Sequence, residues 1–228
     1  MVKQLTFDLA LPPPTFTRGD FVLSEGNREA LAWIDRWPDW PAPALALSGP
    51  PGSGKTHLAR IWATQANAEV IDAPDLEGKS VPDLTALSAA HAAILVDHAD
   101  RAPERALFHL YNLMRERRGH LLLVAELPPA YWRIALPDLA SRLRAAPAVA
   151  VAPPDDELLG SIILKQLSDR QLHAGPGVVQ YLVARMERSA EAARRVVAAL
   201  DRRALSESRE IDRRLAADVL AELAGGTS

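Results

Sequence analysis

The strongest constraint on the fold is a glycine-rich loop between an apolar run and an amphipathic pattern. Residues 44–47 are apolar and predict a buried strand, and a helical pattern with one apolar face begins at Lys55. The loop between them reads Gly49-Pro50-Pro51-Gly52-Ser53-Gly54-Lys55-Thr56. Glycines let such a loop turn tightly, so that several backbone N–H groups point at one phosphate, at the positive end of the helix.

The two residues that close this loop have distinct expected roles. Lys55 supplies a positive charge for the β- and γ-phosphates, and the Thr56 hydroxyl is placed to ligate Mg²⁺. A strand, a loop of this kind and a helix in this order predict a site for a nucleoside di- or triphosphate. The alternative is a glycine-rich turn that binds no ligand.

Composition excludes several classes of protein. The chain has 228 residues, of which 48% are hydrophobic and 24% are charged, enough for a sizeable core in one large or two small domains. It has no cysteine, which excludes a disulfide framework, and its first residues resemble neither a signal peptide nor a membrane span. We therefore expect a cytoplasmic protein without a membrane partner. The net charge of −3 disfavours direct, sequence-specific DNA binding, because proteins that grip a phosphate backbone are usually basic.

Apolar runs and helical patterns alternate as far as residue 151. We expect strands at 44–48, 69–71, 92–97, 121–124 and 149–151, and helices at 27–36, from 55, at 82–88 and at 104–118. This alternation predicts an α/β fold with a mostly parallel sheet flanked by helices. Beyond Pro153-Pro154 the pattern is purely helical, at 155–171, 176–186, 189–206 and 213–223, which predicts a small all-helical lid. The expected organisation is a flexible tail at 1–15, a nucleotide-binding domain at 16–153 and a lid domain at 154–228.

A second nucleotide signature is the apolar strand that ends in Asp97. An acid at the end of a buried strand beside a phosphate-binding loop can hold the hydration shell of Mg²⁺. Many ATPases place a second acid directly after it to polarise water, and here that position is His98. Asp100 lies nearby but out of register. We therefore expect a chain that binds nucleotide and hydrolyses it poorly.

These motifs together resemble the AAA+ ATPases of the DnaA clade, and within it the DnaA regulatory inactivators, the Hda family in its alphaproteobacterial form. The resemblance covers essentially the whole chain. Residues 21–27 are similar to the linker that cradles adenine, residues 138–143 match the "L-x-S-R" element, and residues 193–196 resemble a lid element. The chain ends at Ser228, where initiators of this clade continue into a helix-turn-helix DNA-binding domain, so we expect a regulator rather than an initiator.

The resemblance implies which residues hold the nucleotide, ADP or ATP, together with Mg²⁺. They come from the linker, the loop, the strand end and the lid: Phe21, Val22, Asn27, Gly49, Pro50, Pro51, Gly52, Ser53, Gly54, Lys55, Thr56, His57, Asp97 and Arg194. Thr56 binds Mg²⁺ directly and Asp97 through water. Arg194 reaches the phosphates from a lid helix, with Arg195 as the adjacent candidate. The resemblance further implies that ADP is the nucleotide that supports activity.

The first residues resemble a docking peptide. Gln4-Leu5-Thr6-Phe7-Asp8-Leu9 is similar to the "Q-L-x-L-x-L" peptide by which proteins bind the sliding clamp, the beta subunit of DNA polymerase III. A glutamine that donates and accepts hydrogen bonds, followed by apolar anchors, suits a hydrophobic pocket. We expect the clamp to be bound by Gln4, Leu5, Phe7 and Leu9. The alternative is a first strand packed on the sheet edge.

Arg142 is the expected catalytic residue, and it acts in trans. The resemblance implies an arginine finger that is presented to the nucleotide of a neighbouring DnaA-type initiator, where a guanidinium neutralises charge on the transferring phosphoryl oxygens. We place Arg142 after a proline-bounded turn, with its side chain facing outward. Arg144 is a rival finger, and a surface salt bridge is the alternative role.

Departures from the family pattern weaken autonomous hydrolysis. Val124-Ala125 replace a polar strand end, and Ala145-Ala146 replace an aromatic–glycine pair. The expected function is negative regulation of replication initiation, by a protein that docks on the clamp and stimulates ATP hydrolysis by the initiator. The alternatives are an autonomous AAA+ ATPase or helicase loader and an ordinary P-loop kinase. A homodimer is left open.

Overall fold

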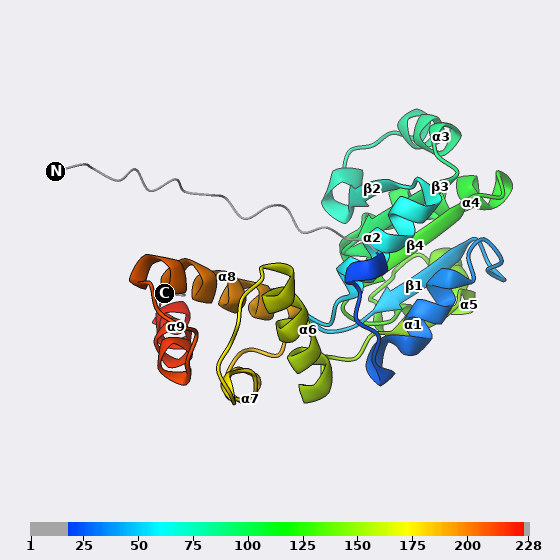
Figure 1. Ribbon diagram of the computed structural model, residues 1–228. Helices are drawn as coiled ribbons and strands as arrows, with labels where there is room; N and C mark the ends of the chain where they lie inside the picture. The colour runs from blue at the N-terminus through cyan, green and yellow to red at the C-terminus, as the bar shows by residue number, and fades with distance from the viewer. Residues whose placement is uncertain (1–17, 226–228) are drawn as a thin grey trace.

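The computed structural model describes residues 18–225, which form a five-stranded sheet with helices on both faces and a set of C-terminal helices (Figure 1). The tail at 1–15 and its docking motif lie outside the described residues. The strands are β1 (Ala44–Ser48), β2 (Glu69–Asp72), β3 (Ala93–Asp97), β4 (His120–Ala125) and β5 (Ala148–Ala150). The helices are α1 (Glu25–Asp35), α2 (Lys55–Ala66), α3 (Val81–Ala90), α4 (Glu104–Glu116), α5 (Pro137–Ala145), α6 (Asp156–Asp169), α7 (Val178–Val183), α8 (Ala190–Glu207) and α9 (Arg213–Gly225).

All strand pairs are parallel, in the order β2-β3-β4-β1-β5. The strand β1 therefore lies between β4 and β5, and the loop that follows β1 opens at the carboxyl edge of the sheet. In an open parallel sheet, ligands bind beyond this edge. The order places the end of β4 beside the loop and the end of β3 one strand further away.

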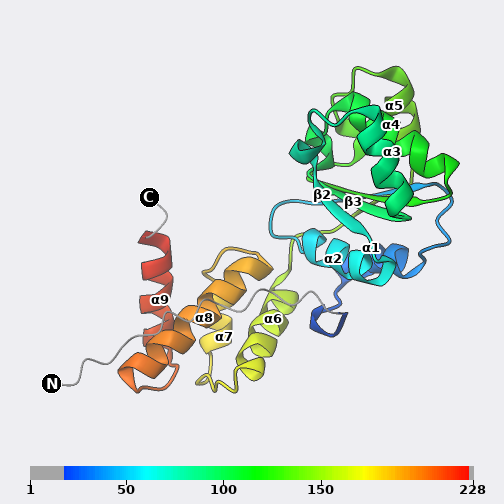
Figure 2. The same ribbon diagram turned by 90° about the horizontal axis from the view of Figure 1, so that it is seen from above.

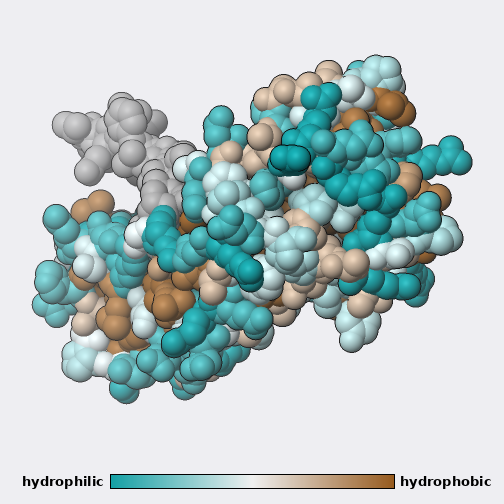
Figure 3. Space-filling model, turned by 90° about the vertical axis from the view of Figure 1, so that its right-hand side faces the viewer, coloured by the Kyte–Doolittle hydropathy of each residue, from teal (hydrophilic) through white to brown (hydrophobic). Residues whose placement is uncertain are grey.

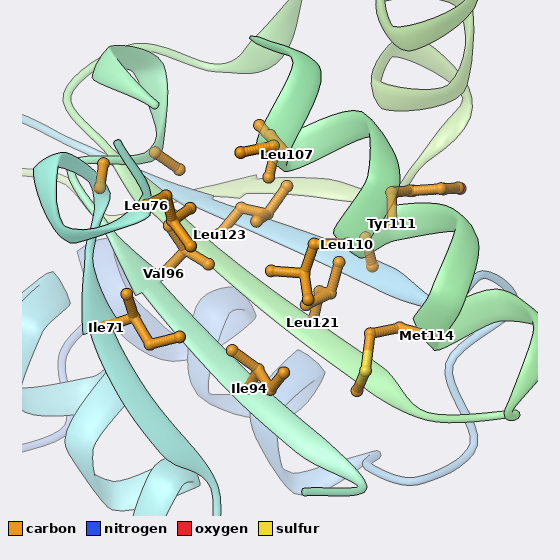
Figure 4. Packing of buried hydrophobic residues seen from close by; sticks show 14 of the residues in the cluster. Ile71, Leu76, Ile94, Val96, Leu107, Leu110, Tyr111, Met114, Leu121 and Leu123 are labelled. Carbon is orange, nitrogen blue, oxygen red and sulfur yellow. The ribbon is translucent and has the colours of Figure 1, made fainter. Parts of the chain in front are cut away.

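Side chains alternate between the two faces of the sheet, and each face has its own helical cover. Ile94 and Val96 pack with α3, α4 and α5, whereas Leu95 packs with α1 and α2. Figure 2 shows these two helical layers on opposite sides of the strands. Figure 4 shows the first cluster, in which side chains of α4 meet those of β3 and β4. Burial on both faces explains why the three central strands, β1, β3 and β4, are apolar runs without a polar alternation.

The C-terminal helices have a separate apolar cluster. Side chains of α6, α7, α8 and α9 form this cluster, among them Leu159, Ile163, Val197 and Leu215. The expected domain boundary at residue 153 falls in the segment between β5 and α6. The division into two domains there stays a prediction.

The predicted fold class is confirmed, and the five expected strands are present with ends shifted by no more than one residue. Two helices differ from the expectation. The helix α7 is shorter than the expected 176–186, and α5 is a helix that we did not expect. Pro137 is the first residue of α5, a position where the missing N–H of proline costs nothing, so this proline begins a helix.

Within residues 18–225 we find no helix with the length and apolarity that would carry it across a bilayer. The face of the molecule in Figure 3 is mostly hydrophilic, with hydrophobic residues in small separate groups. Large exposed apolar side chains include Leu127 and Tyr131, which follow β4.

Candidate nucleotide site

The glycine-rich loop joins the buried strand β1 to the start of α2, and its backbone requires glycine at two positions. Gly52 and Gly54 have φ of 76° and 94°, in the left-handed region that other residues rarely adopt. A Cβ at Gly52 would also overlap with the Cβ of Ser189, the residue that caps the start of α8. A ligand can therefore come close to the backbone of the loop, and the C-terminal helices contact the loop at Gly52.

Ser53 lies inside the loop. Its side chain is buried, and its Oγ has no hydrogen-bond partner among the residues that the structure describes. A buried hydroxyl without a partner is unusual and calls for an explanation. A polar group bound in the loop would supply that partner, so the loop fits the phosphate that its sequence predicts.

Lys55 begins α2 and its ammonium group turns back over the loop. Its Nζ donates a hydrogen bond of 3.1 Å to the carbonyl oxygen of Pro50. Burial lowers the pKa of Lys55, while the nearby carboxylates of Glu126, Asp97 and Asp100 act to raise it. The three acids lie at or just beyond the carboxyl ends of β3 and β4, on the edge of the sheet where ligands bind in open parallel sheets.

Glu126 is a site residue that sequence reasoning missed. Val124-Ala125 are apolar, but the residue directly after β4 is an acid, and its charge acts to raise the pKa of Lys55. The backbone carbonyl of Glu126 also accepts a hydrogen bond of 3.1 Å from the N–H of Gly49, which fixes it beside the loop. An acid two residues beyond the predicted strand end at 124 was the available signal.

Asp97 stands at the end of β3 as expected, and its neighbour is turned away from it. The backbone of His98 is left-handed, with φ of 51°, and its N–H donates a hydrogen bond of 3.0 Å to Oδ1 of Asp97. The His98 side chain reaches sideways, so that its Nδ1 lies 2.8 Å from Oδ1 of Asp72 at the end of β2.

Among the described residues, no group of three or more His, Cys, Asp and Glu side chains could form a protein-only metal cage. Mg²⁺ does not need one, since it keeps several waters and is usually held by one or two protein ligands plus substrate phosphates. The exposed hydroxyl of Thr56 and the half-buried carboxylate of Asp97 suit that mode. The donor set therefore fits Mg²⁺ that arrives with a nucleotide.

The residues expected around the base are brought together. Asn27 is buried; its Nδ2 donates to the carbonyl of Val22 and its Oδ1 accepts from the N–H of Ser24, both at 2.9 Å. The ring of Phe21 meets the ring of His57 edge to face, with centroids 5.4 Å apart. Asn27 thus holds the linker, and the linker places an aromatic residue against the first turn of α2.

Arg142 differs from the expectation in its exposure. It lies on helix α5, after the proline-containing segment that follows β4, and its side chain is half-buried instead of facing outward. The guanidinium carbon lies 5.2 Å from the ring centroid of Phe108 and 5.9 Å from that of Tyr111, both on α4. One of its nitrogens, Nη1, is buried without a hydrogen-bond partner among residues 18–225. Arg144, the rival, is exposed.

Arg194 lies near the start of α8, the helix whose cap contacts the loop. Its guanidinium forms an ion pair with Glu191 at 2.8 Å, and its side chain is 27% exposed. Arg195 instead reaches Glu187 at 3.3 Å and is more exposed. The roles of both arginines stay predictions, as do those of Gln4, Leu5, Phe7 and Leu9, which lie outside the described residues.

Comparison with known proteins supports the fold and the loop. The model of the ATPase family associated with various cellular activities (AAA) matches residues 45–126, the segment from β1 to Glu126. Domain III of the replication initiation protein DnaA from Thermotoga maritima is 20% identical, with a TM-score of 0.79 over 93% of this chain and 98% of that one.

Two further solved structures have the same fold. AMPPCP-bound DnaA from Aquifex aeolicus is 18% identical, with a TM-score of 0.71 over 83% of this chain and 66% of that one. The RuvB Holliday junction branch migration motor of T. maritima is 18% identical, with a TM-score of 0.74 over 92% of this chain and 72% of that one. At these identities the likeness establishes the fold, which is the expected AAA+ fold of DnaA domain III.

Proposed function

We propose that this protein is a nucleotide-bound, cytoplasmic regulator of replication initiation. It docks on the sliding clamp through Gln4, Leu5, Phe7 and Leu9, and it stimulates ATP hydrolysis by a DnaA-type initiator through Arg142. The observation that carries the proposal is the combination of a complete phosphate-binding loop with an arginine held on a separate helix, in the fold of DnaA domain III.

Nucleotide binding is the first part of the proposal. The loop amides and Lys55 would hold the phosphates of ADP or ATP, and Thr56 and Asp97 would hold Mg²⁺. When bound, Mg²⁺ neutralises phosphate charge and orients the phosphates. Phe21 and the linker held by Asn27 would contact the base. The A. aeolicus DnaA of the same fold is described as AMPPCP-bound, which supports an adenine nucleotide.

Slow hydrolysis by the isolated chain is the second part. In its neutral form the His98 ring can accept a proton, but it provides no anionic field to align water beside Mg²⁺. In addition, its ring is engaged by Asp72 at 2.8 Å instead of lying beside the carboxylate of Asp97. The nucleotide in this site would therefore serve to hold the conformation of the protein.

Action on a partner is the third part. The guanidinium of Arg142 packs against α4. The charged groups that act on the pKa of Lys55 are three carboxylates, and Arg142 is not among them. From α5, Arg142 could approach the nucleotide of a neighbouring molecule. An arginine finger in that position raises the rate of hydrolysis by about 10³–10⁵. The cation–π contacts with Phe108 and Tyr111 would hold the guanidinium ready, and the planar fork would span two phosphoryl oxygens.

The deciding experiment combines the protein, clamp loaded on DNA and ATP-loaded initiator, and follows ADP formation with each component omitted in turn. We expect fast hydrolysis only in the complete mixture. A triple variant with Gln4, Leu5 and Phe7 changed to Ala tests the clamp arm, because it should lose clamp binding, for which a peptide of this size has a Kd of about 1 μM, and keep nucleotide binding. Unchanged initiator hydrolysis in the complete mixture would refute the proposal.

The alternative, an autonomous AAA+ ATPase or helicase loader, has one observation in its favour. Glu126 and Asp100 place two further carboxylates near Lys55, and either could align water in place of the missing second acid. Steady-state ATP turnover by the isolated protein separates the two functions. A rate of about 1 s⁻¹ or more, within the usual range of enzymes, would favour the autonomous ATPase.

A further inference from the structure

A carboxylate on α4 binds the chain directly in front of α5. Glu104 is the first residue of α4, and both of its carboxylate oxygens accept hydrogen bonds from consecutive backbone amides. Oε1 accepts from the N–H of Ala135 and Oε2 from the N–H of Leu136, each at 2.8 Å. Hydrogen bonds to a charged acceptor are about twice as strong as neutral ones, and two on one carboxylate also fix its direction.

This contact lies at the start of α5, which has no side-chain cap of its own. Leu136 occupies the cap position and forms no side-chain hydrogen bond, and Pro137 follows without an N–H. Most helices begin with a Ser, Thr, Asp or Asn whose side chain binds the first free amides. Here a residue from another helix, 31 positions earlier than Ala135, binds the amides in front of the helix.

The same face of α4 also holds the arginine of α5. Glu104, Phe108 and Tyr111 are spaced by four and three residues, so they lie on one side of α4. The guanidinium of Arg142 lies over Phe108 and Tyr111. Leu139 and Leu143, both 1% exposed, bury the adjoining side of α5 in the core. One end of α5 is thus fixed by Glu104 and its sixth residue is fixed by the two rings.

We propose that Glu104 is a positioning residue for Arg142. By binding the amides of Ala135 and Leu136 it sets where α5 begins, and therefore which turn of the helix presents Arg142 at the rings of α4. The inference rests on the proposed function, in which Arg142 acts on the nucleotide of a partner. A displacement of about 1 Å in such a group can reduce a rate about 100-fold, so a residue that sets the register of this helix affects the chemistry without touching it.

The test compares Glu104→Gln, Glu116→Gln and Arg142→Ala with the wild type. The glutamine keeps the size of Glu104 but can accept from only one of the two amides and carries no charge. Glu116 ends the same helix and is exposed, so its substitution makes the same chemical change outside the contact. Glu104→Asp, which keeps the charge on a shorter side chain, is a second variant in case Glu104→Gln does not fold.

Two quantities are measured for each variant. The first is initiator ATP hydrolysis against the concentration of the full-length protein, with clamp on DNA present. The second is amide hydrogen exchange. For Glu104→Gln we expect a maximal rate lower by about tenfold to 100-fold, an unchanged half-saturating concentration, and faster exchange confined to residues 135–142. Glu116→Gln should match the wild type in both quantities.

The possible outcomes separate the inference from the proposed function. If Arg142→Ala keeps full stimulation, or if the wild type gives none, the proposed function fails and the role of Glu104 fails with it. If stimulation depends on Arg142 but Glu104→Gln keeps the wild-type maximal rate, only the inference is overturned. A lower maximal rate without faster exchange at 135–142 overturns the inference too. A rise in the half-saturating concentration by the same factor as the fall in rate also overturns it, because that would indicate lost binding of the partner.

Discussion

Nδ1 of His98 lies 2.8 Å from Oδ1 of Asp72, so the residue that follows Asp97 is paired with the end of the neighbouring strand. The left-handed backbone at His98 makes this possible, and histidine is among the residues that adopt it more often than most. Both side chains are about half exposed, at 50% and 51%, so the contact orders the edge of the sheet more than it stabilises the fold.

The first prediction follows from this contact. His98→Asp should raise ATP turnover by the isolated protein by about tenfold or more, since a positioned proton acceptor typically contributes 10²–10⁴ in rate. The new carboxylate would also lose the contact that holds the His98 ring at Asp72. The measurement is steady-state ADP release, and His98→Asn, which tolerates the left-handed backbone but lacks the charge, is the control. An equal rise in ATP turnover in His98→Asp and His98→Asn would mean that the lack of a carboxylate at this position does not limit hydrolysis.

The second prediction concerns the contact between the loop and α8. Gly52→Ala should weaken nucleotide binding at least about tenfold, or about 1.4 kcal/mol, because the new methyl group overlaps with Ser189. Gly78→Ala is a matched control, since Gly78 has a similar φ of 74° and open space around its Cβ position. Both variants should lose about 1–2 kcal/mol of folding free energy from the left-handed backbone. Titration of a fluorescent nucleotide measures the difference, and equal affinities would rule out a role for the contact.

The third prediction concerns the chemistry of Arg142. Arg142→Ala should reduce stimulated initiator hydrolysis by about 10³-fold while ADP and clamp binding persist. The loss of its contacts with Phe108 and Tyr111 should also lower the free energy of unfolding by about 0.5–1 kcal/mol. Arg142→Lys should restore little activity because an ammonium lacks the planar fork.

Arg144→Ala is the control for Arg142→Ala, since Arg144 is exposed on the same helix. Single-turnover hydrolysis and chemical denaturation give the two measurements. If stimulation requires Arg144 and not Arg142, the assignment of the finger is reversed. If Arg142→Ala loses affinity for ADP, Arg142 is a ligand of the nucleotide site in its own molecule.

The fourth prediction concerns pH and His120. Burial lowers the pKa of His120 below its usual value of 6.5, partly offset by the contact of its Nε2 with the carbonyl of Pro38 at 3.1 Å. The unfolded chain therefore takes up the proton first as pH falls, so the stability present above about pH 6.5 decreases between that value and the lower pKa of the folded protein. The midpoint of urea unfolding should fall across this window and fall less in His120→Gln. If the midpoint of urea unfolding changes with pH to the same extent in the wild type and in His120→Gln, the prediction is wrong.

The sequence was sufficient for the fold but not for several contacts in the site. Buried strands and the loop have strong local patterns, which is why β1 and the start of α2 were predicted correctly. The helix α5 was missed because Pro137 also suits a turn. Glu126 was missed because it lies just beyond the apolar run of β4, where no sequence pattern distinguishes a site acid from a loop residue. The contact between Gly52 and Ser189 joins residues far apart in the chain, and no local pattern encodes such an approach.

The distribution of tryptophans gives the protein two separate optical signals. Trp40 stacks on Trp62 and Trp37 meets Trp62 edge to face, so three of the five indoles form one connected group; the indole N–H of Trp40 also donates to the backbone carbonyl of Trp33. The fifth, Trp132, stands alone on the chain between β4 and α5, where its indole N–H donates to the carbonyl of Leu127 at 2.7 Å. Emission from a variant that keeps only Trp132 would therefore follow the segment between Glu126 and Arg142 without interference from the rest of the molecule.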